Sequence, residues 1–338
     1  MAMQKHFRYS NRTFLLLNAI GVESTKVLRR AHLSQELLHE TRFLLTTEEA
    51  FALGEAIAEV SGNPAIGLKL GTVTRTQHFN PSGIAALCSE TLGEAMAQIG
   101  RYKQLTCPEE LVQHKAEGEW TLRFRYLMAD HPEPPVLIQA GFAYLLSIAR
   151  HGTDDKSFSP LRLELMDANA PVKQIKQLFG CNVIAGALQN LMVLREADSA
   201  LPFVTRNAEL FEMLAPQLDQ ELNERRNTES FVDRVRLAIQ EKLTGKRPSM
   251  EDIADVLRLS PRTLQRRLQD DGYSYQRVLE EARRHLARHY LAHSNLDLND
   301  AAFLLGYNDA GSFVRAFRAW EGVPPARWRD EQRSSAVH

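Results

Sequence analysis

The sequence predicts a chain of two domains. We expect an α+β N-terminal domain over residues 1–222, with a helical lobe and a small antiparallel sheet. We expect an all-α C-terminal domain over residues 231–332, with two helix-turn-helix units joined by a connector helix. Three observations support this two-domain prediction. The length of 338 residues suits two domains better than one. Residues 221–230 are polar and charged, as domain boundaries often are. The residues after them repeat one pattern of helix caps and apolar positions.

The composition is that of a cytoplasmic globular protein. Hydrophobic residues make up 44% of the chain and charged residues 25%. The three cysteines are far apart and form no CxxC pair, which favours reduced thiols over a disulfide frame or a zinc site. The apolar stretch 136–149 is too short to span a bilayer, and no signal peptide is recognised. We therefore expect a cytoplasmic protein with no membrane partner, no metal and no cofactor.

The charge is unevenly distributed. A net charge of −1 does not by itself indicate a nucleic-acid-binding protein. One segment is nevertheless basic, with eight arginines against four acidic residues: Arg258, Arg262, Arg266, Arg267, Arg277, Arg283, Arg284 and Arg288 against Asp270, Asp271, Glu280 and Glu281. A local excess of this kind attracts phosphates even when the total charge cancels.

The N-terminal domain mixes helical and strand patterns. Apolar periodicity predicts helices over residues 11–22, 24–33, 46–71 (broken at Gly62-Asn63-Pro64), 91–105 and 136–150. Alternation around Glu117-Gly118 predicts a β-hairpin over residues 111–128, and further strands are expected within 161–168 and 182–195. Helices and strands in this arrangement indicate an α+β fold.

The C-terminal domain contains an internal repeat that follows a helix predicted over residues 231–243. In each copy a capping residue begins a short helix, and a second cap begins another after a tight turn. The matched positions are Ser249, Asp252, Ala254, Leu257, Ser260, Leu264, Arg266 and Leu268 in the first copy, and Asp297, Asp300, Ala302, Leu305, Asp309, Phe313, Arg315 and Phe317 in the second. Each copy therefore predicts a helix-turn-helix unit, whose second helix can enter the DNA major groove.

The segment between the two copies predicts a connector helix over residues 275–293. A helix of that length spans about 30 Å, and one turn of the DNA major groove repeats after roughly 34 Å. A stiff connector of this length would hold two reading helices in adjacent major grooves on one side of a duplex.

Four polar residues of the second helix of the first copy share one face: Arg262, Gln265, Arg266 and Gln269. On an isolated helix such a face would be ordinary solvated surface. Inside a duplicated helix-turn-helix it is suited to reading DNA, because arginine pairs with guanine and glutamine with adenine through two hydrogen bonds. In the second copy only Arg315 offers strong base readout. We therefore expect sequence specificity to depend mainly on the first reading helix.

Two stretches, IADVLRLSPRTLQRRLQDDG and AAFLLGYNDAGSFVRAFRAWEGVPPARWR, resemble the DNA-binding module of the AraC/XylS family of transcription regulators. One position departs from the family pattern. The first turn carries Arg258 where the family usually has glycine, as at Gly306 in the second copy. Either the turn differs, or the arginine accepts a left-handed conformation at a cost of roughly 1 kcal/mol because it reaches a phosphate. We favour the second explanation.

The resemblance implies double-stranded promoter DNA and RNA polymerase as partners. By position in the motif it implies DNA contacts, to bases or to the backbone, from Arg262, Thr263, Gln265 and Arg266. The further candidate DNA-binding residues are Arg267, Asn308, Gly311, Ser312, Arg315 and Arg318. Trp320 and Trp328 are expected to pack in the core rather than to bind DNA.

The N-terminal domain resembles the effector-binding domain of one branch of the same family, which is often labelled arabinose-binding. The likeness rests on GNPAIGLKLG, TLGEAMAQIGRYKQL and FGCNVIAGALQNLMVLREADSALPF, and it implies an unknown small-molecule effector and allows a homodimer. We expect no sugar specificity from that label, and the absence of a Tyr-x-Ser-x-Arg triplet argues against haem. The candidate ligand-binding residues are His78, Phe79, Arg101 and Tyr102, followed by His114, Arg123 and Arg125.

Three functions compete for this chain. The leading hypothesis is a transcription activator that responds to an effector. The alternative is a DNA-binding regulator without an effector, controlled by its abundance or by a protein partner. An enzyme fused to a DNA-binding domain is disfavoured, because the sequence contains no nucleophile–base pair, HExxH motif, P-loop or glycine-rich dinucleotide motif.

Overall fold

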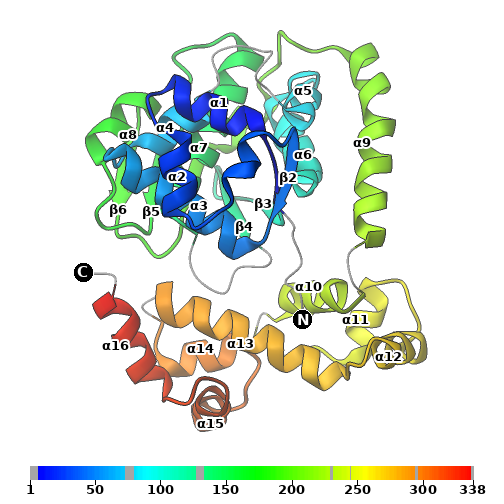
Figure 1. Ribbon diagram of the computed structural model, residues 1–338. Coiled ribbons are helices and arrows are strands. Elements are labelled where there is room, and N and C mark those ends of the chain that lie inside the picture. The colour runs from blue at the N-terminus through cyan, green and yellow to red at the C-terminus, as the bar shows by residue number, and fades with distance from the viewer. Residues whose placement is uncertain are drawn as a thin grey trace. The chain divides into compact units, whose positions relative to one another are not determined.

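The computed structural model describes residues 7–72, 80–126, 133–228, 231–243, 245–293 and 296–335. These residues form two compact units, one ending at Glu224 and the other beginning at Arg225 (Figure 1). The polar segment 221–230, which marks the predicted boundary, is helical as far as Thr228. In the described ranges, no helix is long and apolar enough to cross a membrane.

The helical lobe of the N-terminal unit is built on a short antiparallel hairpin. Its elements are β1 (Phe7–Ser10), α1 (Asn11–Ala19), α2 (Ser24–Arg30), β2 (Arg42–Leu45), α3 (Thr47–Ser61) and α4 (Ile66–Gly71). A capping box between Thr46 and Glu49 begins α3, and Gly62 ends it in the left-handed conformation at φ +59°. The sequence patterns predicted the helices of this lobe but not the β1–β2 hairpin.

The second lobe contains a five-stranded sheet in the order β3-β4-β7-β5-β6. Its strands are β3 (Glu109–Ala116), β4 (Glu119–Tyr126), β5 (Arg162–Leu165), β6 (Asn182–Ala185) and β7 (Leu191–Arg195). The hairpin predicted at Glu117-Gly118 is confirmed, with both residues at positive φ as a two-residue turn of this kind requires. The sheet is antiparallel, as predicted, except that β5 and β6 pair in parallel through the crossover helix α8 (Val172–Phe179).

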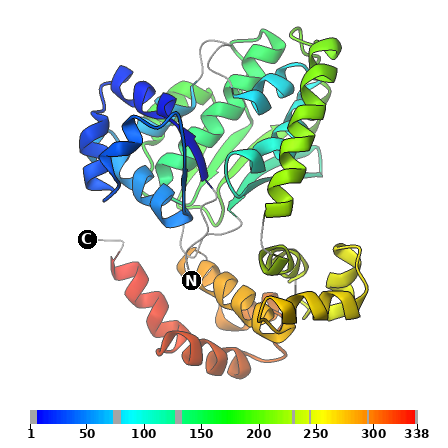
Figure 2. The ribbon, with the colours of Figure 1, turned by 45° about the vertical axis from the view of Figure 1, so that its right-hand side comes forward.

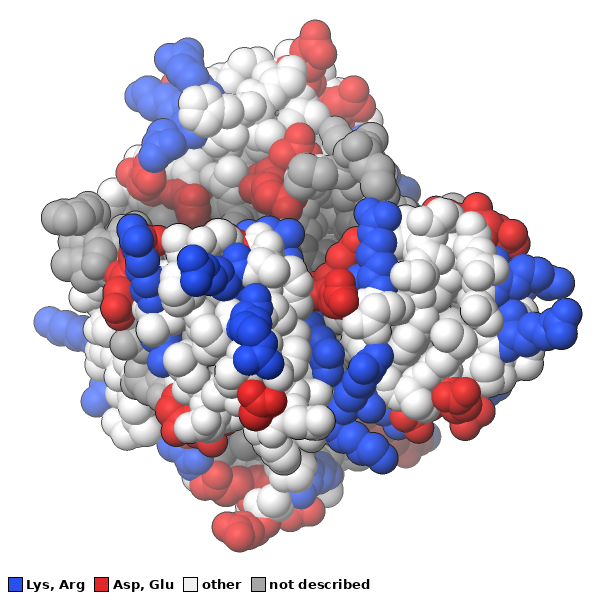
Figure 3. Space-filling model, turned by 90° about the horizontal axis from the view of Figure 1, so that it is seen from below, with Lys and Arg blue, Asp and Glu red and all other residues white. Residues whose placement is uncertain are grey.

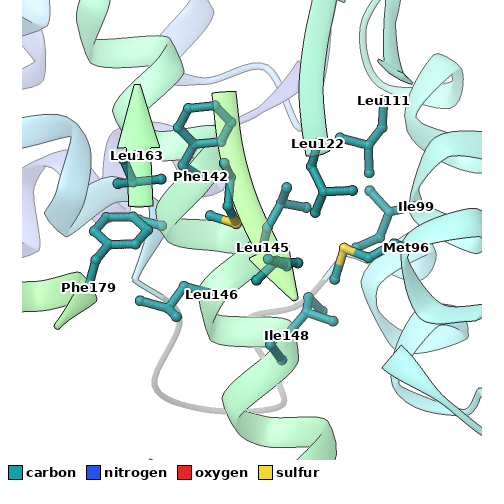
Figure 4. Packing of buried hydrophobic residues seen from close by; sticks show 14 of the residues in the cluster. Met96, Ile99, Leu111, Leu122, Phe142, Leu145, Leu146, Ile148, Leu163 and Phe179 are labelled. Carbon is teal, nitrogen blue, oxygen red and sulfur yellow. The ribbon is translucent and has the colours of Figure 1, made fainter. Parts of the chain in front are cut away.

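Helix α7 (Pro135–Thr153) is the centre of the N-terminal core. Phe142, Leu145, Leu146 and Ile148 on this helix are buried among residues of the sheet and of α6 (Figure 4). Helix α4 crosses α7 so closely that a Cβ atom added at Gly71 would lie 2.1 Å from the carbonyl oxygen of Ala140.

Three further helices complete the N-terminal unit: α5 (Pro81–Leu87), α6 (Leu92–Tyr102) and α9 (Ala208–Thr228). The long helix α9 lies beside α5 and α6 in both ribbon views (Figures 1 and 2). Its side chains Leu218 and Leu222 are buried against Ala85, Tyr102 and Leu105.

The C-terminal unit is all-α, as predicted. Its helices are α10 (Phe231–Lys242), α11 (Met250–Val256), α12 (Pro261–Asp270), α13 (Tyr275–His293), α14 (Leu298–Leu304), α15 (Ala310–Glu321) and α16 (Pro325–Ser335). The connector α13 has a helix-turn-helix pair toward each of its ends (Figure 1). Each pair has its own buried cluster: α10, α11 and α12 pack on the first part of α13, and α14, α15 and α16 pack on its second part.

Candidate nucleic-acid interface

The helices of the first helix-turn-helix unit begin at side-chain caps. Ser249 and Asp252 form a capping box, in which the Ser249 hydroxyl accepts a hydrogen bond from the Asp252 backbone N–H at 3.1 Å. The Ser260 hydroxyl accepts from the backbone N–H of Thr263 at 3.2 Å, and Pro261 occupies the first helical position of α12. Capping by short polar side chains explains why both helix starts were predictable from the sequence.

In the second unit, aspartates replace the capping serines. Asp297 accepts a hydrogen bond from the backbone N–H of Asp300, and Asp309 accepts one from the backbone N–H of Ser312, both at 2.7 Å. An aspartate at this position also interacts favourably with the positive end of the helix dipole. The duplicated capping pattern is therefore present in both units.

The turn of the first unit contains Arg258 in the left-handed conformation, at φ +54°. Its backbone N–H donates to the carbonyl of Asp255 at 3.1 Å, and the N–H of Leu259 donates to the carbonyl of Ala254 at 2.8 Å. These two hydrogen bonds form the Schellman motif that ends a helix at a left-handed residue.

The turn of the second unit has the same pattern around Gly306, at φ +69°. There the N–H of Gly306 donates to Phe303 and the N–H of Tyr307 donates to Ala302. The explanation that the two turns differ is therefore wrong, and Arg258 adopts the conformation that glycine adopts in the other copy. At Gly306 a side chain is excluded in addition by space, because a Cβ atom would lie 2.7 Å from the backbone nitrogen of Arg247.

Replacing Arg258 by glycine is expected to stabilise the first unit by about 0.5–1 kcal/mol, because glycine adopts positive φ without steric cost. Arg258→Ala is the matched control: it removes the same charge but keeps a side chain at positive φ. If the arginine contacts a phosphate, both variants weaken DNA binding equally, while only the glycine variant unfolds at higher denaturant concentration. Equal midpoints for the two variants would show that the turn is not strained.

The reading face predicted on α12 lies at the protein surface. Arg262, Gln265, Arg266 and Gln269 are exposed, whereas Leu264 and Leu268 on the opposite side are fully buried. Four side chains are thus available to a duplex, and the core holds the other side of the helix.

Two other candidate contacts of α12 have partners inside the protein. The hydroxyl of Thr263 lies 2.8 Å from the hydroxyl of the capping residue Ser260. The guanidinium of Arg267 lies over the ring of Phe231, 5.5 Å from its centroid. Arg267 points toward α10, which places it beside the reading face rather than in its centre.

The reading helix α15 presents a smaller outward surface. Asn308, Gly311, Arg315 and Arg318 are exposed and Ser312 is half-buried. A Cβ atom at Gly311 would lie 3.0 Å from a carboxylate oxygen of Asp309, so the first turn of this helix is compact.

Arg315 is held by a chain of hydrogen bonds that begins at Asp309. A guanidinium nitrogen of Arg315 donates to the Ser312 hydroxyl at 2.9 Å, and that hydroxyl donates to Asp309 at 2.7 Å. The hydrogen bonds from Ser312 lower the pKa of Asp309 below its ordinary value. The nearby carboxylate of Asp309 restricts the approach of the Arg315 side chain to base edges. The approach of the Arg266 side chain is less restricted.

One arginine of the basic segment is part of the protein interior. Arg283 is 5% exposed and donates to the carbonyl of Leu305 at 2.9 Å and to that of Gly306 at 2.6 Å. Its guanidinium lies over the ring of Tyr307, 4.3 Å from the centroid. Arg283 therefore holds the turn of the second unit against the connector helix, and its charge is not part of a surface that faces DNA.

Three more arginines of the connector pair with acidic residues of the same unit. Arg284 and Arg288 both bind Glu321, at 2.7 Å and 2.6 Å, and Arg277 binds Glu281 at 3.2 Å. The local basic excess is thus smaller than a count of residues suggests. The space-filling view from below agrees, because Lys and Arg side chains form separate groups over the C-terminal unit with acidic side chains among them (Figure 3).

The ligand-binding candidates of the N-terminal unit fall into two sets. His78 and Phe79 lie outside the described residues. Arg101 and Tyr102 both contact Asp219 of α9, through a guanidinium–carboxylate pair at 2.9 Å and a hydrogen bond from the tyrosine hydroxyl at 2.9 Å. Burial and the hydrogen bond to Asp219 raise the pKa of Tyr102 to about 12. These contacts join α9 to α6, and a role in ligand binding stays a prediction.

The remaining candidates lie on the sheet. His114 is exposed on β3, Arg123 on β4 donates to Gln189 at 3.3 Å, and Arg125 is ion-paired with Glu110 on the neighbouring strand. The structure does not bring these residues together with Arg101 and Tyr102 into one cluster.

The sequence patterns missed a buried polar cluster after α6. The carboxylate of Glu109 is bound by the Lys103 ammonium at 3.0 Å and by the Cys107 thiol at 3.1 Å. Burial raises the pKa of Cys107 to about 12, so this thiol stays protonated and unreactive. The segment between helix and strand has no apolar periodicity, and for that reason no pattern indicated the cluster.

Two family models match the chain. The arabinose-binding domain of AraC transcription regulator, N-terminal, matches residues 21–203, and a helix-turn-helix domain matches residues 253–331. The chain belongs to the AraC family of transcription regulators. This AraC-family regulator is therefore a DNA-binding protein with an N-terminal domain of the arabinose-binding type.

Curated relatives extend over nearly the whole chain. The ornithine utilization regulator of Pseudomonas aeruginosa is 26% identical over 324 residues, which cover 95% of each chain. The regulator VirS of Mycobacterium tuberculosis is 27% identical over 328 residues, which cover 93% of each chain. The crystal structure of the transcriptional regulator CdpR from Pseudomonas aeruginosa is 24% identical and covers 95% of this chain and 98% of its own, with a TM-score of 0.45. Because the relatives are transcription regulators, the prediction that this AraC-family chain is not an enzyme is confirmed.

Proposed function

We propose that this regulator activates transcription in the cytoplasm by binding promoter DNA with both helix-turn-helix units and contacting RNA polymerase, under control of a small-molecule effector bound in its N-terminal domain. The observation that supports two-site reading is the connector. Helix α13 is continuous over 19 residues, a length of about 28 Å. It joins two helix-turn-helix units whose reading helices carry polar side chains on their outward faces. The length of the connector is close to the distance between successive turns of the major groove, roughly 34 Å.

The two reading helices are proposed to act differently. Helix α12 presents Arg262, Gln265 and Arg266 in the open, so it supplies most of the sequence specificity. On α15, Arg315 is tied to Ser312, and the other exposed positions are small or lie near the helix ends. This helix is proposed to bind chiefly through backbone and phosphate contacts, which carry no sequence information.

Replacing Arg266 by alanine is therefore expected to weaken binding to the cognate duplex by about 5- to 150-fold and to leave scrambled duplex binding nearly unchanged, because a bidentate base contact contributes about 1–3 kcal/mol. Arg315→Ala should weaken binding to both duplexes alike. Titrations at one fixed salt concentration measure both effects, since phosphate contacts depend strongly on salt. Arg327→Ala, which removes an exposed arginine on α16, is the matched control. A greater loss of specificity with Arg315→Ala than with Arg266→Ala would reverse the ranking.

The cognate duplex comes from a genome-wide footprint of bound DNA. Transcription from that promoter by purified RNA polymerase, with and without the regulator, then tests activation directly. Higher transcript yield supports an activator, and lower yield identifies a repressor. A metabolite that both raises the thermal stability and changes promoter affinity supports effector control, because a ligand of the folded state must stabilise it.

A further inference from the structure

The N-terminal unit contains a cleft of about 620 Å³ beside α9. It lies between the β1–β2 hairpin, the first turn of α1, the start of α5 and the middle of α9. Three arginines line it, Arg8, Arg12 and Arg42, and we call it the arginine cleft. Its volume is in the range that holds a metabolite-sized ligand, roughly 300–1,000 Å³.

The lining of the arginine cleft is cationic. The lining contains three guanidinium groups and one carboxylate. The carboxylate belongs to Glu221 on α9 and is ion-paired with Arg8. Arg12 and Arg42 are exposed and make no ion pair or hydrogen bond through their side chains within the described part of the chain. Two guanidinium groups beside an open volume are thus available to an anion.

The fold brings these arginines together from separate parts of the sequence. Strands β1 and β2 pair so that Ser10 lies opposite Arg42, and Arg12 follows two residues later in the first turn of α1. Ser10 makes no side-chain capping bond, and the first turn of α1 carries no acidic residue. The backbone N–H groups of that turn add to the positive potential that the arginines create.

The cleft also has apolar walls. Tyr9, Leu105 and Leu218 line it together with the arginines. Burial raises the pKa of Tyr9, so its hydroxyl stays neutral. This combination suits an organic molecule with an anionic group and a carbon skeleton rather than a bare inorganic ion.

We propose that the arginine cleft is the effector site and that it binds a small organic acid through a carboxylate or phosphate group. The planar guanidinium group binds both oxyanions through two parallel hydrogen bonds, which makes arginine the suited residue for such a ligand. The proposal rests on the proposed control of this regulator by an effector.

The position of Glu221 connects the site to α9. An oxyanion bound in the cleft competes with Glu221 for the guanidinium of Arg8 and weakens one of the contacts that hold α9. Other contacts that hold α9 include the buried Leu218 and Leu222 and the bonds of Asp219 to Arg101 and Tyr102. Because the oxyanion and Glu221 compete for Arg8, binding in the cleft and the docking of α9 are linked equilibria. Helix α9 is followed in the chain by α10 of the DNA-binding unit.

Isothermal titration of the full-length protein at constant ionic strength tests the site. Citrate serves as the carboxylate probe, glucose 6-phosphate as the phosphate probe and glucose as the matched neutral compound. At least one of the two anions is expected to bind saturably, and glucose is not. Which anion binds identifies the group that the cleft prefers. If neither anion binds saturably, the proposal is overturned.

Two variants should shift the affinity in opposite directions. Arg42→Gln is expected to weaken anion binding about tenfold, because a charge-assisted bidentate contact is lost. Glu221→Gln is expected to strengthen it severalfold, because Arg8 loses its competing carboxylate. Arg29→Gln, an exposed arginine of the same unit outside the cleft, should leave the affinity unchanged. An unchanged affinity for Arg42→Gln would place the anion elsewhere and refute the site.

The site and effector control can fail separately. If neither anion binds but a neutral metabolite changes promoter affinity, the arginine cleft is refuted and effector control stands. If an anion binds in the cleft without changing promoter affinity, the site stands as a binding site and its role as the effector site is refuted.

Discussion

Replacing Phe317 by alanine is expected to lower the free energy of unfolding of the second helix-turn-helix unit by about 3–5 kcal/mol. The Phe317 side chain is fully buried. Its ring packs edge-on against Phe313 at 5.8 Å, against Trp320 at 6.4 Å and against Trp328 at 5.7 Å between centroids. The aromatic neighbours Phe313, Trp320 and Trp328 already occupy their own places in the cluster, so they would fill the space only in part.

The loss should be confined to one half of the DNA-binding domain. Native-state hydrogen exchange of the full-length variant should show lower protection in α14 and α15 and nearly unchanged protection in α11 and α12, because the two buried clusters are separate. Phe303→Ala is the matched control, since Phe303 is 61% exposed in the same unit and its loss should cost less than about 1 kcal/mol. Equal loss of protection in both units would mean that the domain unfolds as one.

The sequence predicted the C-terminal unit nearly residue by residue because its signals are local. Capping residues lie next to the helices that they begin, and Leu264, Leu268, Phe313 and Phe317 recur at the spacing that buries one helix face. Trp320 and Trp328 pack against the second cluster as expected, although both remain partly exposed.

Features that depend on residues far apart in the chain were not predictable in the same way. The parallel pairing of β5 with β6 depends on strand order, which no local pattern encodes. The sequence predicts a local excess of positive charge in the arginine segment, yet Arg284 and Arg288 share Glu321, more than thirty residues later, whose carboxylate offsets one of their two charges. The arginine cleft was missed for the same reason, since only the β1–β2 register places Arg42 near Arg12.

Replacing Glu321 by glutamine is expected to destabilise the C-terminal unit by about 2–3 kcal/mol. The Glu321 side chain is 6% exposed and accepts hydrogen bonds from Arg288 at 2.9 and 2.6 Å and from Arg284 at 2.7 Å. Removing one partner from a buried pair costs about 3–5 kcal/mol. We expect less here, because the Arg284 side chain is 43% exposed and the solvent screens its charge.

The effect of Glu321→Gln should depend on pH in a direction that identifies the ion pair. Burial raises the pKa of Glu321, but the hydrogen bonds from Arg288 and Arg284 outweigh it and hold the pKa below its ordinary value, which is about 4.3. A carboxyl group whose pKa is lowered by folding contributes its stability above that ordinary value and loses it as the pH falls through the lowered one. The difference in unfolding free energy between wild type and variant should therefore be largest above about pH 5 and shrink as the pH falls below about 4.

Glu331→Gln, in an exposed pair with Arg327, is the matched control and should change stability by less than about 0.5 kcal/mol. Hydrogen exchange of α13 and α15 measures both variants, and a pH-independent loss for Glu321→Gln would show that packing, not charge, holds α15 to the connector.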